Sequence, residues 1–269
     1  MTAENNNTLY MDVRGQGETI VMLHGWGMHS GILDGLSSVL SKHFKVISID
    51  LPGHGYSSTQ CPLTLSEVSE QILSQIDMDC HWLGWSLGGS IVMSMAEIAP
   101  ERFKSMTLLS ANPCFVSKQQ WPHGINASVF CGFVDDLQQD YQKTLKKFLA
   151  LQTLSSEGGA ATLKQLRQQL FATGEPDLMA LRQGLDILIQ TDMRGSLEDS
   201  QIPSLMLLGE RDQLVPVSIA AYYQSLPSHP QVEVIANAGH TPFLSHPETT
   251  AALISDFIEQ QCHEVVNNG

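Results

Sequence analysis

The chain has 269 residues, 42% hydrophobic and 16% charged, which suits one substantial core and disfavours a disordered or coiled-coil protein. Its net charge of −14 disfavours nucleic acid and anionic membrane surfaces as partners. The first residues lack the basic and apolar regions of a signal peptide, and no run approaches the ~20 apolar residues that span a bilayer. We therefore expect a monomeric, cytoplasmic protein with no membrane-bound part.

Short apolar runs alternate with helical patterns through the first half of the chain. The expected strands are residues 19–23, 45–49, 81–84 and 105–109, and the expected helices are residues 32–44, 65–76 and 87–99. Such alternation is typical of a mostly parallel sheet flanked by crossover helices, so the fold class is α/β.

Between residues 112 and 195 the pattern is helical only, with stretches at residues 129–151, 160–171 and 178–189. Alternation then resumes with strands at residues 204–208 and 232–235 and helices at residues 217–225 and 248–262. Open α/β sheets bind ligands at the carboxyl ends of their strands. We therefore divide the chain into a core of residues 1–111 and 196–269 and an inserted all-helical lid of residues 112–195.

The five cysteines are scattered, and none forms a C-x-x-C pair. This favours free thiols over disulfides. No His/Cys cluster has the spacing of metal ligands, and we expect neither a metal nor an organic cofactor.

Positive charge gathers in residues 141–170, which have a local net charge of +4 in an otherwise acidic chain. Runs of charge usually form a solvated helix face, and that interpretation stays open here. The basic residues of this window are Lys143, Lys146, Lys147, Lys164 and Arg167.

A G-x-S-x-G sequence spans residues 84–88, between an expected strand and an expected helix. The serine of such a sequence sits on a tight strand-to-helix turn that only flanking glycines leave room for. Ser86 is therefore the candidate nucleophile. The main-chain N–H of Leu87, at the start of the helix, is then placed to stabilise an oxyanion.

A serine hydroxyl needs a base within hydrogen-bond reach, and His240 follows the last expected strand and a glycine. Asp212 follows the strand before it and completes the chain order Ser…Asp…His. Its carboxylate would fix the imidazole tautomer. Glu210 and His246 are the nearest competitors, and we interpret His246 as a helix-capping residue.

The loop after the first expected strand, His24-Gly25-Trp26-Gly27, fits a second oxyanion donor, supplied by the main-chain N–H of Trp26. We interpret His24 as a structural residue that ties down this turn. Trp26 and Trp85 flank the nucleophile in the sequence, which suggests an apolar rim.

Together these residues resemble the α/β-hydrolase superfamily and, within it, the family of pimeloyl-[acyl-carrier protein] methyl ester esterases of biotin synthesis. The superfamily motifs are specific for the fold but not for the substrate. The narrower likeness rests on residues 23–27, 82–89, 112–115, 120–122 and 148–153.

The resemblance implies cleavage of a methyl ester from a pimeloyl chain attached to an acyl carrier protein. It places substrate-binding residues at Trp26, Ser86, Leu87, His240 and the lid segment, namely Phe148, Leu149, Ala150, Leu151 and Gln152. The basic lid residues become candidates for docking the acidic carrier. The family's lid basics are largely arginines, whereas most here are lysines, which keep the charge but lose bidentate geometry.

Two other functions stay open at this point. A general short-chain carboxylesterase or a carbon–carbon bond hydrolase would use the same triad, because the fold does not determine the substrate. A non-catalytic binding protein could keep the pocket without the reaction, although an intact set of Ser86, Asp212 and His240 argues against it.

Overall fold

The computed structural model describes residues 8–58 and 63–268, with side chains up to residue 263. Seven strands form one sheet in the order β1-β3-β2-β4-β5-β6-β7. Only β1 is antiparallel to its neighbour; the other pairs are parallel. The strands are β1 Met11–Arg14, β2 Thr19–Leu23, β3 Lys45–Ile49, β4 Cys80–Trp85, β5 Phe103–Leu109, β6 Ser204–Gly209 and β7 Gln231–Ile235.

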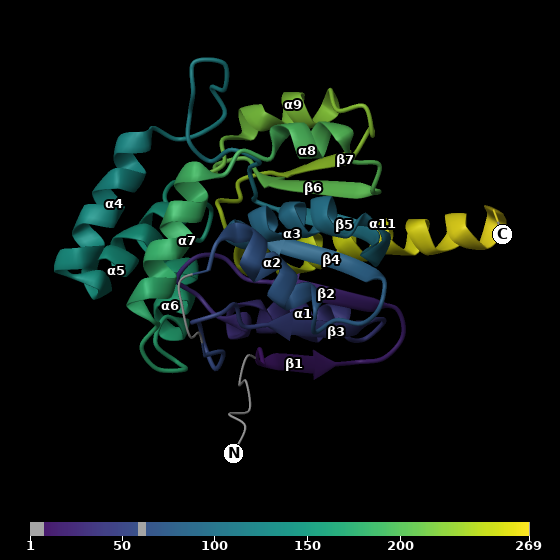
Figure 1. Ribbon diagram of the computed structural model, residues 1–269, viewed down its shortest axis with the longest axis horizontal. Coiled ribbons are helices and arrows are strands. Elements are labelled where there is room, and N and C mark those ends of the chain that lie inside the picture. Colours follow the sequence, from purple (N-terminus) through teal and green to yellow (C-terminus); the bar gives the residue numbers. More distant parts are fainter. Residues whose placement is uncertain (1–7, 59–62, 269) are drawn as a thin grey trace.

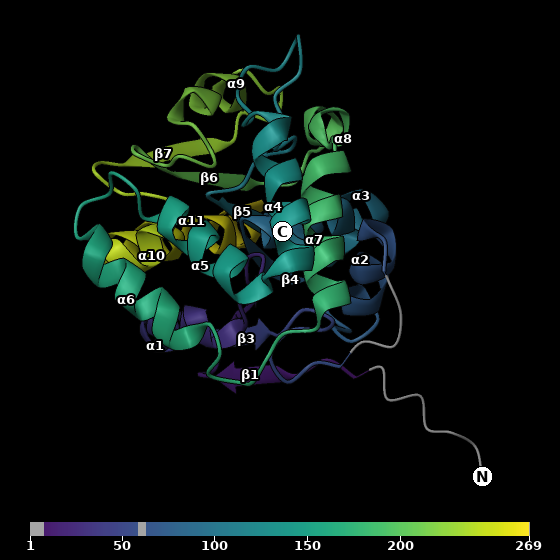
Figure 2. The same ribbon diagram turned by 90° about the vertical axis from the view of Figure 1, so that its left-hand side faces the viewer.

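Helices cover both faces of this sheet (Figures 1 and 2). In Figure 2, α1, α10 and α11 lie on one side of the strands, and α2, α3 and α8 lie on the other. These helices are α1 Asp34–Leu40, α2 Leu65–Leu73, α3 Leu87–Ile98, α8 Arg194–Asp199, α10 Pro242–Ser245 and α11 Pro247–Asn268; α9 Ala220–Gln224 lies near β6 and β7. Because both faces are covered, the central strand β4 is buried at all six residues.

The remaining four helices lie together at one end of the sheet, on the left of Figure 1. They are α4 Ala127–Gln139, α5 Tyr141–Gln152, α6 Gly159–Gln169 and α7 Leu178–Gln190. The carboxyl ends of β2 and β4 face this group, because Trp26, just beyond β2, bonds to α7. The α/β fold with a mostly parallel sheet, expected from the sequence, is confirmed.

Each expected strand is present, and those at residues 19–23 and 45–49 have the expected bounds. The single helix expected at residues 129–151 is wrong: it is two helices separated at Asp140. The backbone of Asp140 is not helical, with φ −156° and ψ 88°, and its side chain accepts the Lys143 N–H. An aspartate that caps a new helix start in this way ends the preceding one.

The helix expected at residues 32–44 is also shorter, because it begins with the 3₁₀ turn η1 Ser30–Leu33 and its α-helical part ends at Leu40. Two further 3₁₀ turns are η2 Pro100–Arg102 and η3 Val217–Ile219. Strand β1 and helices α8 and α10 were not expected. The lid boundary placed after residue 195 falls inside α8, and the division of the chain into core and lid stays a prediction.

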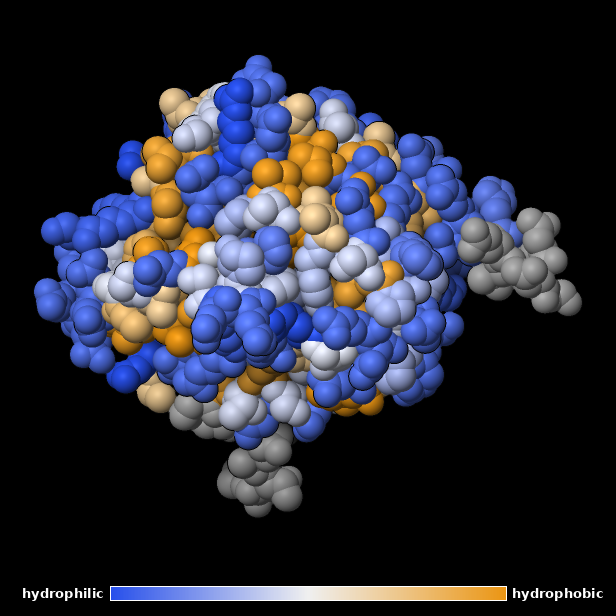
Figure 3. Space-filling model, turned by 90° about the horizontal axis from the view of Figure 1, so that it is seen from above, coloured by the Kyte–Doolittle hydropathy of each residue, from blue (hydrophilic) through white to orange (hydrophobic). Residues whose placement is uncertain are grey.

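Apolar side chains form one continuous core between the sheet and its helices. Seen from above, the surface is mostly hydrophilic, and hydrophobic side chains reach it in separate clusters (Figure 3). In the part of the chain that the structure describes, no helix is long and apolar enough to cross a bilayer.

Candidate active site

Ser86 stands on the turn that joins β4 to α3, with φ 55° and ψ −116°. A positive φ is costly for a residue with a side chain, so the surrounding backbone must hold it. The flanking glycines allow this close packing. A Cβ at Gly84 would lie 2.3 Å from the carbonyl oxygen of Gly88, and one at Gly88 would lie 2.4 Å from that of Leu23. The two glycines are therefore needed for the close packing around Ser86, as expected from the sequence.

Ser86, His240 and Asp212 form a continuous chain of hydrogen bonds. Ser86 Oγ lies 2.8 Å from His240 Nε2, and His240 Nδ1 lies 2.8 Å from Asp212 Oδ2. The side chains of His240 and Asp212 are excluded from solvent, and Ser86 is buried. Because a carboxylate can only accept, His240 donates its Nδ1–H to Asp212 and turns the Nε2 lone pair toward the serine hydroxyl. This is the tautomer that removes a proton from serine.

The loop after β6 fixes the orientation of Asp212. Its Oδ1 accepts the main-chain N–H groups of Leu214 and Val215 at 2.7 and 3.0 Å, which leaves Oδ2 for the histidine. Glu210 faces elsewhere, since its Oε2 accepts the N–H of Asn237 at 2.8 Å. The structure therefore brings Asp212, and not Glu210, to the histidine.

Two main-chain contacts hold the loop of His240. Its N–H donates to the Gln152 carbonyl at 3.1 Å, and its own carbonyl accepts the Trp85 indole N–H at 2.9 Å. The expected apolar rim is wrong for both tryptophans, because the side chains of Trp26 and Trp85 are buried. The centroid of the Trp85 ring lies 5.8 Å from that of His240 and 5.1 Å from that of Phe243.

Comparison with known proteins shows the family of the chain. Residues 18–247 match the family described as the alpha/beta hydrolase fold. The chain belongs to this family.

Two curated relatives of this α/β hydrolase are both named "Pimeloyl-[acyl-carrier protein] methyl ester esterase". The protein of Xylella fastidiosa (strain 9a5c) is 40% identical over 253 residues, which cover 93% of this chain and 98% of the relative. The protein of Yersinia enterocolitica is 38% identical and covers 94% and 98%. The family resemblance seen in the motifs is confirmed.

Solved structures support the fold of the hydrolase. An esterase from Exiguobacterium antarcticum superposes with a TM-score of 0.84 at 21% identity, covering 93% of this chain and 95% of that one. A bromoperoxidase from Bacillus anthracis gives 0.81 at 20% identity, covering 93% and 95%. At these identities the likeness shows the fold alone.

The loop after β2 connects the hydrolase core to its helical insertion. The indole N–H of Trp26 donates to the Leu181 carbonyl of α7 at 2.6 Å. Its ring packs edge-to-face against Phe148 of α5, with 4.8 Å between the ring centroids. Leu87 begins α3, so its N–H has no partner within the helix. The oxyanion-binding roles of the Trp26 and Leu87 main chains stay predictions.

Gly184 of α7 was missed from the sequence, although a glycine inside a helical pattern is a recognised sign of close packing. A Cβ at this position would lie 2.5 Å from Trp26 Cδ1 and 3.2 Å from Leu87 Cδ2. The glycine therefore lets α7 approach both loops that flank Ser86.

The expected lid segment lies at the carboxyl end of α5, where Phe148, Leu149 and Gln152 are buried and Ala150 and Leu151 are partly exposed. Gln152 reaches the triad through its main chain, by the bond to His240. Its side-chain Oε1 is buried without a protein partner. The segment is thus adjacent to the catalytic loop, and its contact with substrate stays a prediction.

The basic residues of the insertion differ in their surroundings. Lys147 Nζ pairs with Asp136 Oδ2 of α4 at 2.6 Å, so part of its charge is neutralised. Lys146 and Arg167 line one groove of about 750 Å³ between α5 and α6, and Glu175 lies at the same groove. Lys143 and Lys164 are exposed.

His24 has the structural role expected of it. Its Nε2 accepts the Leu51 N–H at 2.9 Å, and its Nδ1–H donates to the Gly25 carbonyl at 2.9 Å. Burial lowers the pKa of His24 to about 3, so the ring is neutral. It braces the turn next to Trp26. Among the described residues, no hydrogen bond joins it to Ser86.

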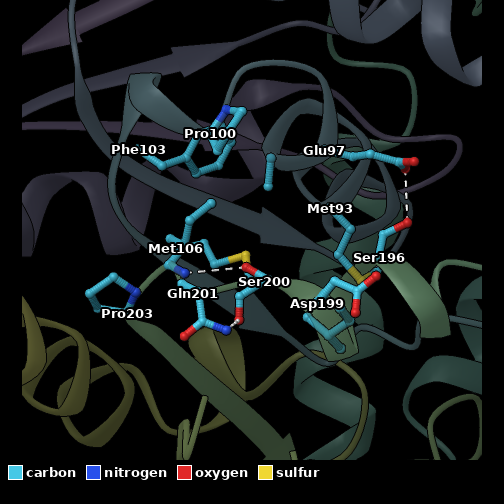
Figure 4. A pocket seen from close by; sticks show the side chains of 13 residues that line it. Met93, Glu97, Pro100, Phe103, Met106, Ser196, Asp199, Ser200, Gln201 and Pro203 are labelled. Atoms are coloured by element: carbon cyan, nitrogen blue, oxygen red, sulfur yellow. Dashed lines mark hydrogen bonds between the residues drawn. The ribbon is translucent and has the colours of Figure 1, made fainter. Parts of the chain in front are cut away.

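A pocket of about 600 Å³ lies apart from the triad, between α3, the start of β5 and α8. Figure 4 shows the side chains of Glu97 and Ser196 pointing toward one another, and Ser196 Oγ donates to Glu97 Oε2 at 2.9 Å. No histidine, cysteine or lysine is among the residues that line this pocket.

Proposed function

We propose that this α/β hydrolase is a serine carboxylesterase that hydrolyses the methyl ester of pimeloyl-[acyl-carrier protein] to the free acid and methanol, in biotin synthesis. The observation that carries the proposal is the buried chain of hydrogen bonds from Ser86 through His240 to Asp212. The names of relatives that cover nearly all of this chain support the substrate. The cytoplasm, where we expect the protein, is the compartment this proposal needs.

In the first step, His240 Nε2 removes the proton of Ser86, and Ser86 Oγ forms a bond to the ester carbonyl carbon. The negative charge moves to the carbonyl oxygen, which accepts hydrogen bonds from the main-chain N–H groups of Trp26 and Leu87. The imidazolium is stabilised by the carboxylate of Asp212, 2.8 Å from Nδ1. His240 then protonates the methoxy oxygen, and methanol leaves.

In the second step, His240 removes a proton from water, whose oxygen attacks the acyl-serine carbonyl. The bond to Ser86 Oγ breaks, and the proton on His240 returns to it. The products are the carboxylic acid, which ionises, and the original enzyme. Each proton is held by His240 in turn, and no step requires a metal or an organic cofactor.

Residues 112–195 act as a lid in this proposal. Helices α5 and α7 touch Trp26, and the end of α5 bonds to the loop of His240. Ser86 is only 2% exposed, and in this proposal these helices move apart from the core to admit the acyl chain. Phe148 and the residues up to Gln152 would then line the path of the acyl chain.

The carrier protein is acidic in this proposal and meets the basic face of the lid. Lys146 and Arg167 are the strongest docking candidates, because they share one groove and no ion pair is found for either side chain among the described residues. Lys143 on α5 and Lys164 on α6 are further exposed candidates. Lys147 contributes least because Asp136 already pairs with it.

A panel of esters tests the proposed substrate. We expect the carrier-linked pimeloyl methyl ester to be cleaved with a higher kcat/KM than p-nitrophenyl acetate or butyrate, and addition of salt to raise KM for the carrier-linked ester alone. If only the short esters are cleaved, the protein is a general esterase. If folded protein cleaves none and fails to react with a fluorophosphonate probe, the non-catalytic alternative is correct.

A further inference from the structure

Three side chains with metal-binding atoms meet at the end of the sheet where β2 and β4 begin, opposite the triad. Glu18 precedes β2, His81 lies near the start of β4, and Cys262 is carried by α11. One ligand atom from each lies within 4.8 Å of the others, and this is the one such group of three found in residues 8–58 and 63–263. The triad lies at the other end of β4, five residues from His81, or roughly 16 Å along an extended strand.

The spacing of these atoms is close to that of a tetrahedral zinc site. His81 Nε2 lies 3.9 Å from Cys262 Sγ and 4.0 Å from the nearer oxygen of Glu18. Bonds of ~2.0 Å to nitrogen and ~2.3 Å to sulfur at tetrahedral angles place the ligand atoms roughly 3.5 Å apart. Both pairs with His81 are within about 0.5 Å of this spacing, and the three atoms lie within 4.8 Å of one another, so side-chain movements of up to about 1 Å would close the site.

The neighbouring residues orient the ligands. His81 Nδ1 lies 2.8 Å from Ser105 Oγ, and donation of the Nδ1–H to this hydroxyl leaves the Nε2 lone pair facing the other two ligands. An orienting partner on the second ring nitrogen is typical of metal-ligating histidines. Lys104 Nζ lies 2.6 Å from Glu18 Oε2, so a cation already pairs with this carboxylate.

The geometry points to a zinc site formed by Glu18, His81 and Cys262, with the ammonium of Lys104 competing with the metal for Glu18. A mixed nitrogen, sulfur and oxygen ligand set suits Zn²⁺ better than Mg²⁺ or Ca²⁺, which prefer oxygen alone. Three protein ligands leave a fourth position for water. The site would tie α11 to the starts of β2 and β4, so it would stabilise the fold and take no part in ester cleavage.

Cobalt tests the site, because a thiolate bound to Co²⁺ gives a charge-transfer absorption that carboxylate and imidazole ligands do not. The full chain, freed of metal with a chelator, is titrated with Co²⁺ and then with Zn²⁺. We expect one Co²⁺ per chain with a thiolate band, displacement of that band by Zn²⁺, and a higher Tm with Zn²⁺ than without.

Single substitutions assign the ligands. Cys262→Ser should abolish the band, Glu18→Gln should weaken binding about tenfold, and Lys104→Gln should strengthen it. Cys131→Ser is the matched control, since Cys131 is an exposed thiol on α4 and its loss should change nothing. All four variants should hydrolyse esters at the wild-type rate.

Several results would overturn the proposal: no thiolate band in the wild-type protein, a band that survives Cys262→Ser, or a Lys104→Gln variant that binds no more tightly. None of them would affect the proposed esterase, whose residues lie at the other end of the sheet.

Discussion

Asp212→Asn would reverse the tautomer of the catalytic histidine. In the native site, Oδ1 of Asp212 accepts the N–H groups of Leu214 and Val215, and Oδ2 accepts the Nδ1–H of His240. The asparagine must keep its oxygen on the two main-chain donors, so its NH₂ group faces His240. An NH₂ group can only donate, so the ring proton moves to Nε2 and points at Ser86. His240 then cannot accept the serine proton.

The expected loss follows from this change. A wrong tautomer in a Ser-His-Asp triad lowers kcat by about 10⁴-fold, equivalent to about 5.5 kcal/mol of transition-state stabilisation. We expect the full effect here because both side chains are excluded from solvent, so water cannot replace the carboxylate. KM should change little, since Asp212 does not face the substrate. Initial rates with p-nitrophenyl butyrate measure both constants.

Glu210→Gln is the matched control. It removes the same charge from the same loop, but Glu210 accepts only the Asn237 N–H among the hydrogen bonds found for its side chain, so we expect a rate within about threefold of wild type. A similar Tm for the two variants would exclude unfolding as the cause. Activity of Asp212→Asn within tenfold of wild type would refute the reasoning.

Three further predictions follow from the packing, the buried histidine and the lid. Gly184→Ala should lower kcat/KM and destabilise the fold by about 1–3 kcal/mol, because the new Cβ would clash with Trp26. Gly132 is exposed on α4 with open space around it, so Gly132→Ala should stabilise the fold by up to about 1 kcal/mol. Urea unfolding measures both changes. Because burial holds the pKa of His24 at about 3, the unfolded state binds its proton first as the pH falls. The free energy of unfolding of the wild-type protein should therefore decrease below about pH 6.5, with a contribution from this ring of up to about 1.4 kcal/mol per pH unit. The decrease should be less steep in His24→Gln, and equal slopes for the two proteins would contradict this prediction. Lys146→Gln should raise KM for the carrier-linked ester several-fold. Lys147→Gln should raise it much less, because Lys147 already pairs with Asp136. Equal effects of the two substitutions in steady-state kinetics would contradict the proposal that Lys146 contributes more to docking than Lys147.

The positions of the parallel strands in the chain and the nucleophile could be predicted because each is specified locally. The apolar runs of the parallel strands are short and bounded by turns. The glycines around Ser86 are required because a Cβ at Gly84 or Gly88 would lie 2.3–2.4 Å from a main-chain carbonyl oxygen. By contrast, β1 is a four-residue edge strand with no fully buried residue, so hydrophobic periodicity carries no signal for it. The break at Asp140 was missed because its capping bond competes with a helical pattern on both sides.

The parts of the site that could not be predicted depend on contacts between distant segments. The indole N–H of Trp85 donates to the carbonyl of His240, 155 residues away in the sequence. A glycine inside a helical pattern indicates close packing, but the partner of Gly184, Trp26, is known only once α7 is placed in the fold. The pairing of Lys147 with Asp136 weakens a charge that the sequence counts in full.

Methanol release from the carrier-linked pimeloyl methyl ester, by the wild-type protein and by Ser86→Ala, tests the central claim most directly. The account predicts one methanol per ester cleaved by the wild-type enzyme and a rate at least 10⁴-fold lower for the folded variant, with the free pimeloyl group left on its carrier. Equal rates for the two proteins would show that Ser86 is not the nucleophile. No release by a wild-type protein that still cleaves p-nitrophenyl esters would contradict the proposed substrate.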